Sequence, residues 1–179
     1  MIKYVAFLRG INVSGQKIIK MDALKEMLTL PGFKNVRTYI QSGNVLFQTN
    51  EADPNILIQK IEKKLLKDLG YSVSVVIRTL DEINEVISNN PFTNLAEDDN
   101  RKISVTFLSA LPEQEKANNL PKKTEENDEL HIRNKEIYLL YVSYGESKLS
   151  NSFFEKKLAL TATTRNWATI NKIAALLQQ

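Results

Sequence analysis

The sequence predicts an α+β fold of two ferredoxin-like halves, each ordered β-α-β-β-α-β, packed together and followed by an extra C-terminal helix. Two observations lead to this prediction. Residues 1–78 alternate, in that order, between apolar runs of strand length and segments with apolar side chains at helical spacing. Residues 101–179 repeat most of the pattern. Residues 79–100 form the connection, with a short helix and an acidic, turn-rich stretch.

The first strand and the first helix have the clearest signals. Ile2–Leu8 is apolar on both faces, as in a central strand. Met21–Leu30 carries apolar side chains at helical spacing, and Pro31-Gly32 ends it. Arg9–Lys20, which holds two glycines, is therefore a loop between them.

A hairpin and a second helix complete the first half. Val36–Gln41 and Val45–Thr49 favour strands, and a two-residue loop of Gly43-Asn44 predicts a type II′ turn. This register pairs Ile40 with Phe47 on one face. The remaining elements are a helix from Pro54 to Leu69, capped by Gly70, and a strand over Val73–Ile77.

The same patterns assign the rest of the chain. The predicted helices are Asp81–Asn89, Glu113–Leu120, Ser152–Leu160 and Trp167–Leu177. The predicted strands are Ile103–Ser109 and a hairpin of Leu130–Arg133 with Glu136–Val142 around Asn134-Lys135. The segment between the last two helices receives no strand.

The topology predicts which segments meet. In a split βαβ unit the crossover keeps the first two strands parallel. The loop Arg9–Lys20 and the turn Ser42–Asn44 should therefore lie side by side, with Gly70 at the same edge. Glycine and asparagine gathered at one edge suit a backbone that approaches a ligand closely.

Composition excludes several classes of site. The chain has no cysteine and one histidine, His131, so it lacks thiolate chemistry and paired-histidine metal motifs. The acidic run Glu97–Asn100 lacks EF-hand spacing and is typical of a solvated loop. No metal or cofactor is predicted. Lys3 and Arg9 interrupt the opening apolar run, so we expect a cytoplasmic protein without a membrane partner.

Charge is distributed unevenly. Residues 1–50 carry seven basic and two acidic side chains, a net of +5, whereas residues 51–100 carry five and ten, a net of −5. Residues 151–179 carry four and one, a net of +3. If both basic ends meet, they form a face that favours an anionic ligand. The plainer alternative is solvated charge on helix surfaces.

Three motifs bear on function. Gly10–Lys17 nearly matches the phosphate-binding P-loop, but its lysine comes one residue late and no Ser or Thr follows, so a looser anion nest fits better. Ser147-Lys148 are adjacent residues whose side chains point apart on a regular element, which favours an ordinary loop. Thr164 or Asn166 is expected to cap the last helix, with Arg165 beside its positive end. That arginine needs an anion or a carboxylate partner.

An RNA-recognition sheet is not favoured. Such a sheet carries aromatic side chains on its first and third strands and a characteristic aromatic motif, which is absent here. Phe7 could stack a base from the first strand, but the third strand offers Leu46 and Gln48 on that face.

Several of these blocks resemble a known family. They are Leu8–Val13 (LRGINV) with Met21, Thr38–Val45 (TYIQSGNV), Gly145–Leu149 (GESKL), Glu155–Leu158, and Thr163–Trp167 (TTRNW) with Lys172. Together they are similar to the bacterial family of domains of unknown function numbered 1697 (DUF1697). Ser14 stands where that family usually has a second glycine. The resemblance implies two ferredoxin-like halves, but no activity, cofactor or site residue.

The resulting hypothesis is a binding protein whose ligand is an anion, either nucleic acid or a phosphorylated small molecule. Its predicted site is a polar cleft between the halves, lined by Arg9, Asn12, Gln41, Ser42, Asn44, Arg165 and Asn166. Two alternatives stay open. In one, the same cleft serves an enzyme, a hydrolase or a transferase. In the other, these residues only hold the halves together. The sequence does not define the oligomeric state.

Overall fold

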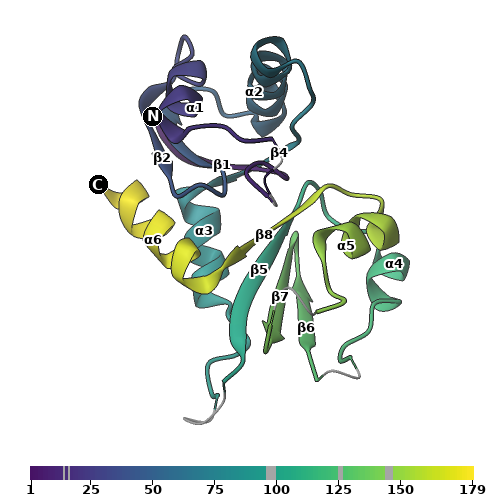
Figure 1. Ribbon diagram of the computed structural model, residues 1–179. Helices are drawn as coiled ribbons and strands as arrows, with labels where there is room; N and C mark the ends of the chain where they lie inside the picture. The colour runs from purple at the N-terminus through teal and green to yellow at the C-terminus, as the bar shows by residue number, and fades with distance from the viewer. Residues whose placement is uncertain (14, 16, 96–99, 125–126, 144–146) are drawn as a thin grey trace. The chain divides into compact units, whose positions relative to one another are not determined.

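The computed structural model describes all residues except 14, 16, 96–99, 125–126 and 144–146. Within the described residues, eight strands and six helices form an α+β fold with two four-stranded antiparallel sheets (Figure 1). The chain divides into two compact units. The first unit comprises residues 1–84 and 172–179, and the second comprises residues 85–171. None of the described helices is both long and apolar enough to cross a membrane.

The first sheet has the strand order β2-β3-β1-β4. Its elements are β1 (Ile2–Leu8), α1 (Met21–Met27), β2 (Lys34–Tyr39), β3 (Asn44–Thr49), α2 (Pro54–Leu69) and β4 (Val75–Thr79). The C-cap predicted for α2, Gly70, is confirmed, and Asp53 caps the other end. Asp53 accepts a hydrogen bond from the N–H of Asn55 at 2.8 Å, and Gly70 ends the helix at φ +77°.

The second sheet has the matching order β6-β7-β5-β8. It follows α3 (Leu80–Ser88) and contains β5 (Lys102–Leu108), α4 (Gln114–Asn118), β6 (Glu129–Arg133), β7 (Glu136–Tyr141), α5 (Asn151–Leu158) and β8 (Ala162–Asn166). The extra C-terminal helix is α6 (Trp167–Gln178). The chain passes from one unit to the other within α3 and again within α6.

The last eight residues belong to the first unit, although the sequence grouped them with the second half. Arg37 of β2 donates from Nη2 to the carbonyl oxygen of Leu176 at 2.6 Å. Lys3 of β1 donates from Nζ to the carbonyl oxygen of Gln178 at 3.1 Å. These contacts fasten the end of α6 to the sheet of the first unit.

The two sheets repeat each other in register as well as in order. Val5 of β1 lies opposite Leu46 and Arg78, and Val105 of β5 lies opposite Tyr138 and Arg165. The backbone contacts beyond the strands repeat too. The N–H of residue 8 donates to the carbonyl of residue 43 at 2.9 Å, and residue 108 does the same to residue 135 at 2.9 Å. The sequence revealed the repetition only as an order of elements.

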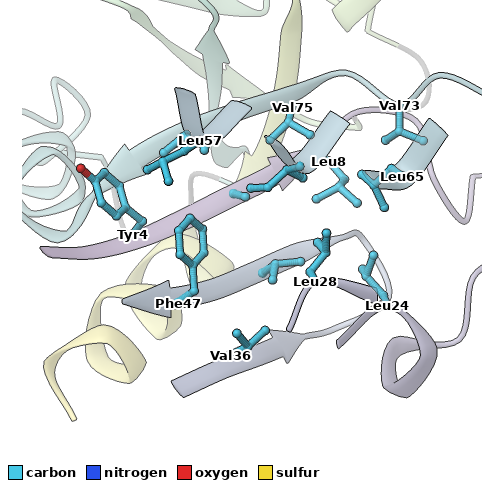
Figure 2. Packing of buried hydrophobic residues seen from close by; sticks show 14 of the residues in the cluster. Tyr4, Leu8, Leu24, Leu28, Val36, Phe47, Leu57, Leu65, Val73 and Val75 are labelled. Carbon is cyan, nitrogen blue, oxygen red and sulfur yellow. The ribbon is translucent and has the colours of Figure 1, made fainter. Parts of the chain in front are cut away.

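The core of the first unit lies between its helices and one face of its sheet. Figure 2 shows Leu24 and Leu28, Leu57 and Leu65 of α2, and Phe47 of β3 gathered on this face. The rings of Phe33 and Phe47 stack with centroids 4.2 Å apart. Removing each such side chain from water contributes roughly 1.5–3 kcal/mol to the stability of the unit.

The predicted hairpin register is wrong. Tyr39 pairs with Asn44 and Arg37 with Leu46, so the turn spans the four residues 40–43 rather than Gly43-Asn44 alone. The reason is the side chain of Asn44, which is fully buried. Its Nδ2 donates to the carbonyl oxygen of Tyr39 at 2.9 Å and to Oγ of Ser42 at 3.0 Å. These bonds close the longer turn, and Ile40 adopts φ +49° within it.

The strand β8 was missed. Its sequence, ATTRN, is polar and lacks the alternation that signals a half-buried strand. As an edge strand it pairs on one side only, with β5. Its threonines contribute hydrogen bonds instead of apolar packing, such as the 2.7 Å contact between Thr106 Oγ1 and Thr164 Oγ1.

Candidate functional site

Three segments of the first unit meet at one edge of its sheet. We define the loop edge as the described residues of 9–20 together with residues 40–43 and 70–74. The Nδ2 of Asn12 donates to the carbonyl oxygen of Gln41 at 2.8 Å, which joins the loop to the turn. The N–H of Arg9 donates to the carbonyl oxygen of Ser74 at 2.9 Å, which joins the loop to the approach to β4. The predicted meeting of these segments is confirmed.

Asn12 holds the loop together. It adopts φ +52°, a left-handed conformation that asparagine tolerates better than most residues. Its Oδ1 accepts from the N–H of Ile19 at 2.7 Å, and its Nδ2 donates to the carbonyl oxygen of Ile19 at 3.1 Å. Its own N–H donates to the carbonyl oxygen of Lys17 at 3.2 Å. The amide predicted to orient a ligand therefore positions the loop that carries the nearby charges.

Gly43 lets the turn approach the loop closely. It has φ +75°, and a Cβ there would lie 2.6 Å from Cδ1 of Ile11 and 2.9 Å from Cβ of Leu8. Ile11 and Leu8 are both almost fully buried. The turn and the loop are therefore packed against each other without space for a side chain at this position.

Basic side chains dominate the loop edge. Residues 9–20 contain three basic residues, Arg9, Lys17 and Lys20, and no acidic residue. Arg9 is half-buried, and the two lysines are exposed. The Nζ of Lys17 lies 5.1 Å from the ring centroid of Tyr71 and donates to the carbonyl oxygen of Ser72 at 3.3 Å. This contact positions a positive charge at the edge, close to the exposed backbone.

The remaining residues of the edge are polar or apolar and exposed. Gln41 and Ser42 of the turn are exposed, as the predicted site requires. Val13, Ile18 and Ile40 are also exposed, at 57%, 74% and 44%. The loop edge thus combines basic, amide and apolar groups.

The fold itself does not require a loop of this length. Twelve residues, 9–20, connect β1 to α1, whereas five residues, 109–113, make the corresponding connection from β5 to α4. The two halves have the same strand order and register. Long loops in compact domains often carry function. The extra residues of the first loop therefore point to a role beyond connection.

Arg165 and Asn166 lie in the second unit, at the end of β8. The Nη1 of Arg165 donates to Oγ1 of Thr163 and to the carbonyl oxygen of Thr164, each at 2.8 Å, and the side chain is almost fully buried. Asn166 accepts from the N–H of Thr169 at 2.8 Å, so the predicted cap on the last helix is present. Arg165 belongs to the strand before the helix, where its local partners include a hydroxyl and a carbonyl.

Arg165 has a counterpart that sequence reasoning missed. Arg78 occupies the equivalent position of β4, opposite Val5, and is 2% exposed. Its Nη1 donates to the carbonyl oxygen of Ile77 at 2.8 Å, the same contact with the preceding residue that Arg165 makes. An arginine just before a helix in both halves was the available signal. This repeated placement supports a structural role for both arginines.

The structure therefore separates the seven predicted residues into two groups. Arg9, Asn12, Gln41, Ser42 and Asn44 lie together in the first unit, and Arg165 and Asn166 lie in the second. A cleft shared by both groups stays a prediction. Within the first group, the side chains of Asn12 and Asn44 serve local structure. The candidates for contact with a ligand are Arg9, Gln41 and Ser42, joined by Lys17 and Lys20.

The other motifs have local roles. Ser147 lies in a loop, as expected, and its Oγ donates to Oδ2 of Asp128 at 2.6 Å. His131 is exposed, and its ring meets Phe92 edge-on with centroids 5.3 Å apart. Residues 97–99 of the acidic run, and Gly145 before Ser147, lie outside the described residues. Among the residues that the structure describes, no group of three or more His, Asp or Glu side chains could hold a metal ion.

Comparison with known proteins adds the family and the fold. A family model described as "Protein of unknown function (DUF1697)" matches residues 1–138, which include the whole loop edge. A solved structure, "The structure of conserved bacterial protein SP0830 from Streptococcus pneumoniae", is similar with a TM-score of 0.71 and 22% sequence identity. The match covers 98% of each chain. No curated protein matches this sequence.

Proposed function

Because the chain belongs to the DUF1697 family, whose description names no function, we propose a function from the loop edge itself: a cytoplasmic binding protein for a phosphate-bearing ligand. The observation that carries the proposal is the length of the first loop. Twelve residues stand where five suffice in the other half, and they bring three basic residues and no acidic one.

The chemistry of the loop edge suits phosphate. Guanidinium and ammonium groups form short, charge-assisted hydrogen bonds with phosphate oxygens. Arg9 and Lys17 supply these charges, and the exposed Gln41 and Ser42 add neutral hydrogen-bonding groups. Asn12 holds the loop against the turn. Because the loop is already ordered, ligand binding loses less conformational entropy. The ligand is either a nucleic acid or a phosphorylated small molecule.

We also assign each half to the ferredoxin-like plan. The strand orders β2-β3-β1-β4 and β6-β7-β5-β8 support this assignment. Along the chain, a helix also follows the first and the third strand of each half. The fold alone carries no activity, since this plan hosts many unrelated functions.

The test is a fluorescence-anisotropy titration with labelled single- and double-stranded oligonucleotides at several salt concentrations. The variant is Arg9→Gln/Lys17→Gln. The control is Lys25→Gln/Lys34→Gln, which removes the same charge from exposed positions of the first unit outside the loop edge. If both loop-edge groups contact phosphates of a single strand, the variant lowers the slope of log K against log salt by about 1.4, or roughly 0.7 per contact.

A second titration distinguishes the source of the phosphate. Calorimetry with pyrophosphate on the same variants reports a small-molecule ligand if the oligonucleotides do not bind. Oligonucleotide binding that the control pair weakens as much as the loop-edge pair would mean a nonspecific basic surface and would contradict the proposal. Absence of binding to either probe at low salt would also overturn it.

A further inference from the structure

A pocket of about 760 Å³ lies in the second unit beside its edge strand β6. Its apolar lining includes the buried Leu120 and Leu130 and the half-buried Ile132. Gln114 and Asn118 of α4 and Lys122 also line the pocket. Its volume falls within the range of roughly 300–1,000 Å³ that is typical of small-molecule sites.

Comparison of the two halves explains why the pocket exists. In the first unit, α1 and the residue after it bring Leu24 and Leu28 into the core beside Val36 of β2. The corresponding helix of the second unit, α4, has the sequence QEKAN and buries no residue. Leu120, two residues after α4, does reach the core of the second unit. This place therefore holds one buried leucine, where the first unit has both Leu24 and Leu28.

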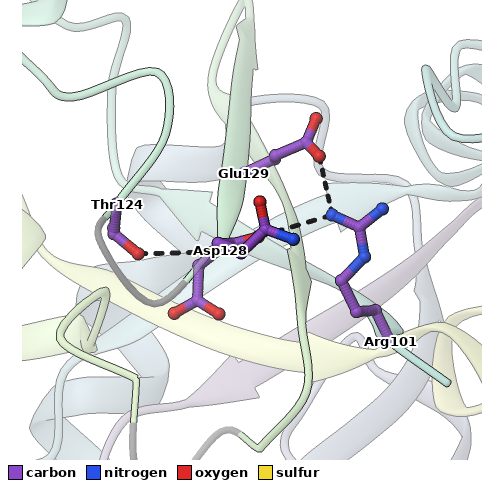
Figure 3. Close-up of polar contacts among 5 residues, drawn as sticks. Arg101, Thr124, Asp128 and Glu129 are labelled. Carbon is purple, nitrogen blue, oxygen red and sulfur yellow. Dashed lines mark hydrogen bonds and ion pairs between the residues drawn. The ribbon is translucent and has the colours of Figure 1, made fainter. Parts of the chain in front are cut away.

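The segment that carries Lys122 makes contacts of its own with β6 and within itself. The carbonyl oxygen of Lys122 accepts from the N–H of Leu130 at 3.1 Å. The N–H of Thr124 donates to the carbonyl oxygen of Asp128 at 2.9 Å, and the N–H of Asp128 donates to Oγ1 of Thr124 at 3.2 Å. Arg101 pairs with Glu129 at 2.6 Å between Nη1 and Oε1 (Figure 3). The hydrogen bonds of Lys122, Thr124 and Asp128 hold this segment beside β6.

The charge of the lining selects the ligand. Among the described residues that line the pocket, Lys122 carries the only permanent charge, and no carboxylate faces it. His131 is also part of the lining. Because side chains alternate along a strand, its side chain lies on the face of β6 opposite to that of Leu130, and its ring contacts Phe92 there. A lining with apolar side chains and one lysine fits a molecule with an apolar body and one negative end.

We propose that this pocket binds a small carboxylate with an unbranched or branched apolar chain, the chain on Leu120, Leu130 and Ile132 and the carboxylate near Lys122. The site consists of residues of the second unit, and the proposal does not depend on the function proposed for the loop edge. Octanoate is a suitable probe, and octanamide has the same chain without the charge.

The test measures both probes by calorimetry and by amide chemical shifts on the full chain. Lys122→Gln removes the charge, and Lys67→Gln on α2 is its control. Ala117→Leu fills the pocket from α4 with a strong helix former. Ala175→Leu, at an exposed position of α6, is the matched control.

Octanoate should shift the amides of Leu120, Leu130 and Ile132 in a saturable way and bind more tightly than octanamide. Lys122→Gln should weaken octanoate about fivefold, as expected for one exposed ion pair, and leave octanamide unchanged. Ala117→Leu should weaken both at least tenfold while Ala175→Leu has no effect. Absence of saturable octanoate binding at millimolar concentration, or equal binding by Ala117→Leu and the wild type, would overturn the proposal.

Discussion

Replacing Gly43 by alanine tests the close packing of the turn against the loop. The added Cβ would lie 2.6 Å from Cδ1 and 2.8 Å from Cγ1 of Ile11, and 2.9 Å from Cβ of Leu8. The Cβ of Leu8 is fixed by the backbone of β1, and Ile11 is only 2% exposed, so neither can move aside freely. The alanine must also adopt φ +75°.

The expected loss of stability has two parts. A left-handed conformation costs an alanine about 1–2 kcal/mol relative to glycine. Overpacking in a filled core adds about 1–3 kcal/mol. Gly43→Ala should therefore lower the free energy of unfolding by about 2–5 kcal/mol. Gly70→Ala is the matched control, because Gly70 has φ +77° with nothing within 4 Å of the position that a Cβ would take, and it should cost only about 1–2 kcal/mol.

Urea unfolding followed by circular dichroism measures both variants, with equal m-values required before the free energies are compared. Hydrogen exchange adds a local readout, because the N–H of Leu8 donates to the carbonyl oxygen of Gly43 at 2.9 Å. This amide should lose protection in Gly43→Ala and keep it in Gly70→Ala. Equal destabilisation by the two substitutions would refute the close approach of turn and loop.

Three further predictions concern single side chains. Burial raises the pKa of Tyr138, whose hydroxyl donates to the carbonyl oxygen of Val86 at 2.9 Å, to about 12. The unfolded chain releases this proton from about pH 10, so the free energy of unfolding should fall by about 2 kcal/mol between pH 10 and 12. Urea titrations across that range should show a smaller fall for Tyr138→Phe. Ser147→Ala removes one hydrogen-bond donor from the buried carboxylate of Asp128 and should lower the free energy of unfolding by about 1–3 kcal/mol in the same assay. Adding Asp128→Asn to that variant should restore part of the lost stability. If it restores none, the contact between Ser147 and Asp128 is not the cause of the loss. Asn12→Ala should raise the exchange rate of the Ile19 amide, whereas Asn12→Asp, which keeps the Oδ1 acceptor, should protect it better. Identical exchange in both variants would contradict this role of Asn12.

The sequence was sufficient wherever apolar spacing determines the structure. It located the helices and most strands to within a few residues, and the crossover argument placed the loop Arg9–Lys20 beside the turn. It failed where a polar side chain decides the backbone. Asn44 lengthens the turn through two hydrogen bonds, and β8 is an edge strand of threonines with no apolar alternation.

The candidate site was predicted in part for a similar reason. Residue type marked Arg9, Gln41 and Ser42 as candidates, and all three lie at the loop edge. Residue type did not reveal that Asn12 is occupied by bonds to Ile19 and Gln41. Such bonds join residues apart in the sequence, so only the folded chain shows them.

The double passage of the chain between the units has a consequence for synthesis on the ribosome. The second unit is continuous, residues 85–171, and all of it emerges before residues 172–179 do. The first unit begins earlier in the chain. However, Arg37 can form its hydrogen bond to Leu176, and Lys3 its bond to Gln178, only after the end of α6 has been made. The part of the protein made first is therefore the part finished last, and its sheet must stay competent to receive the end of α6 while the rest of the chain is made.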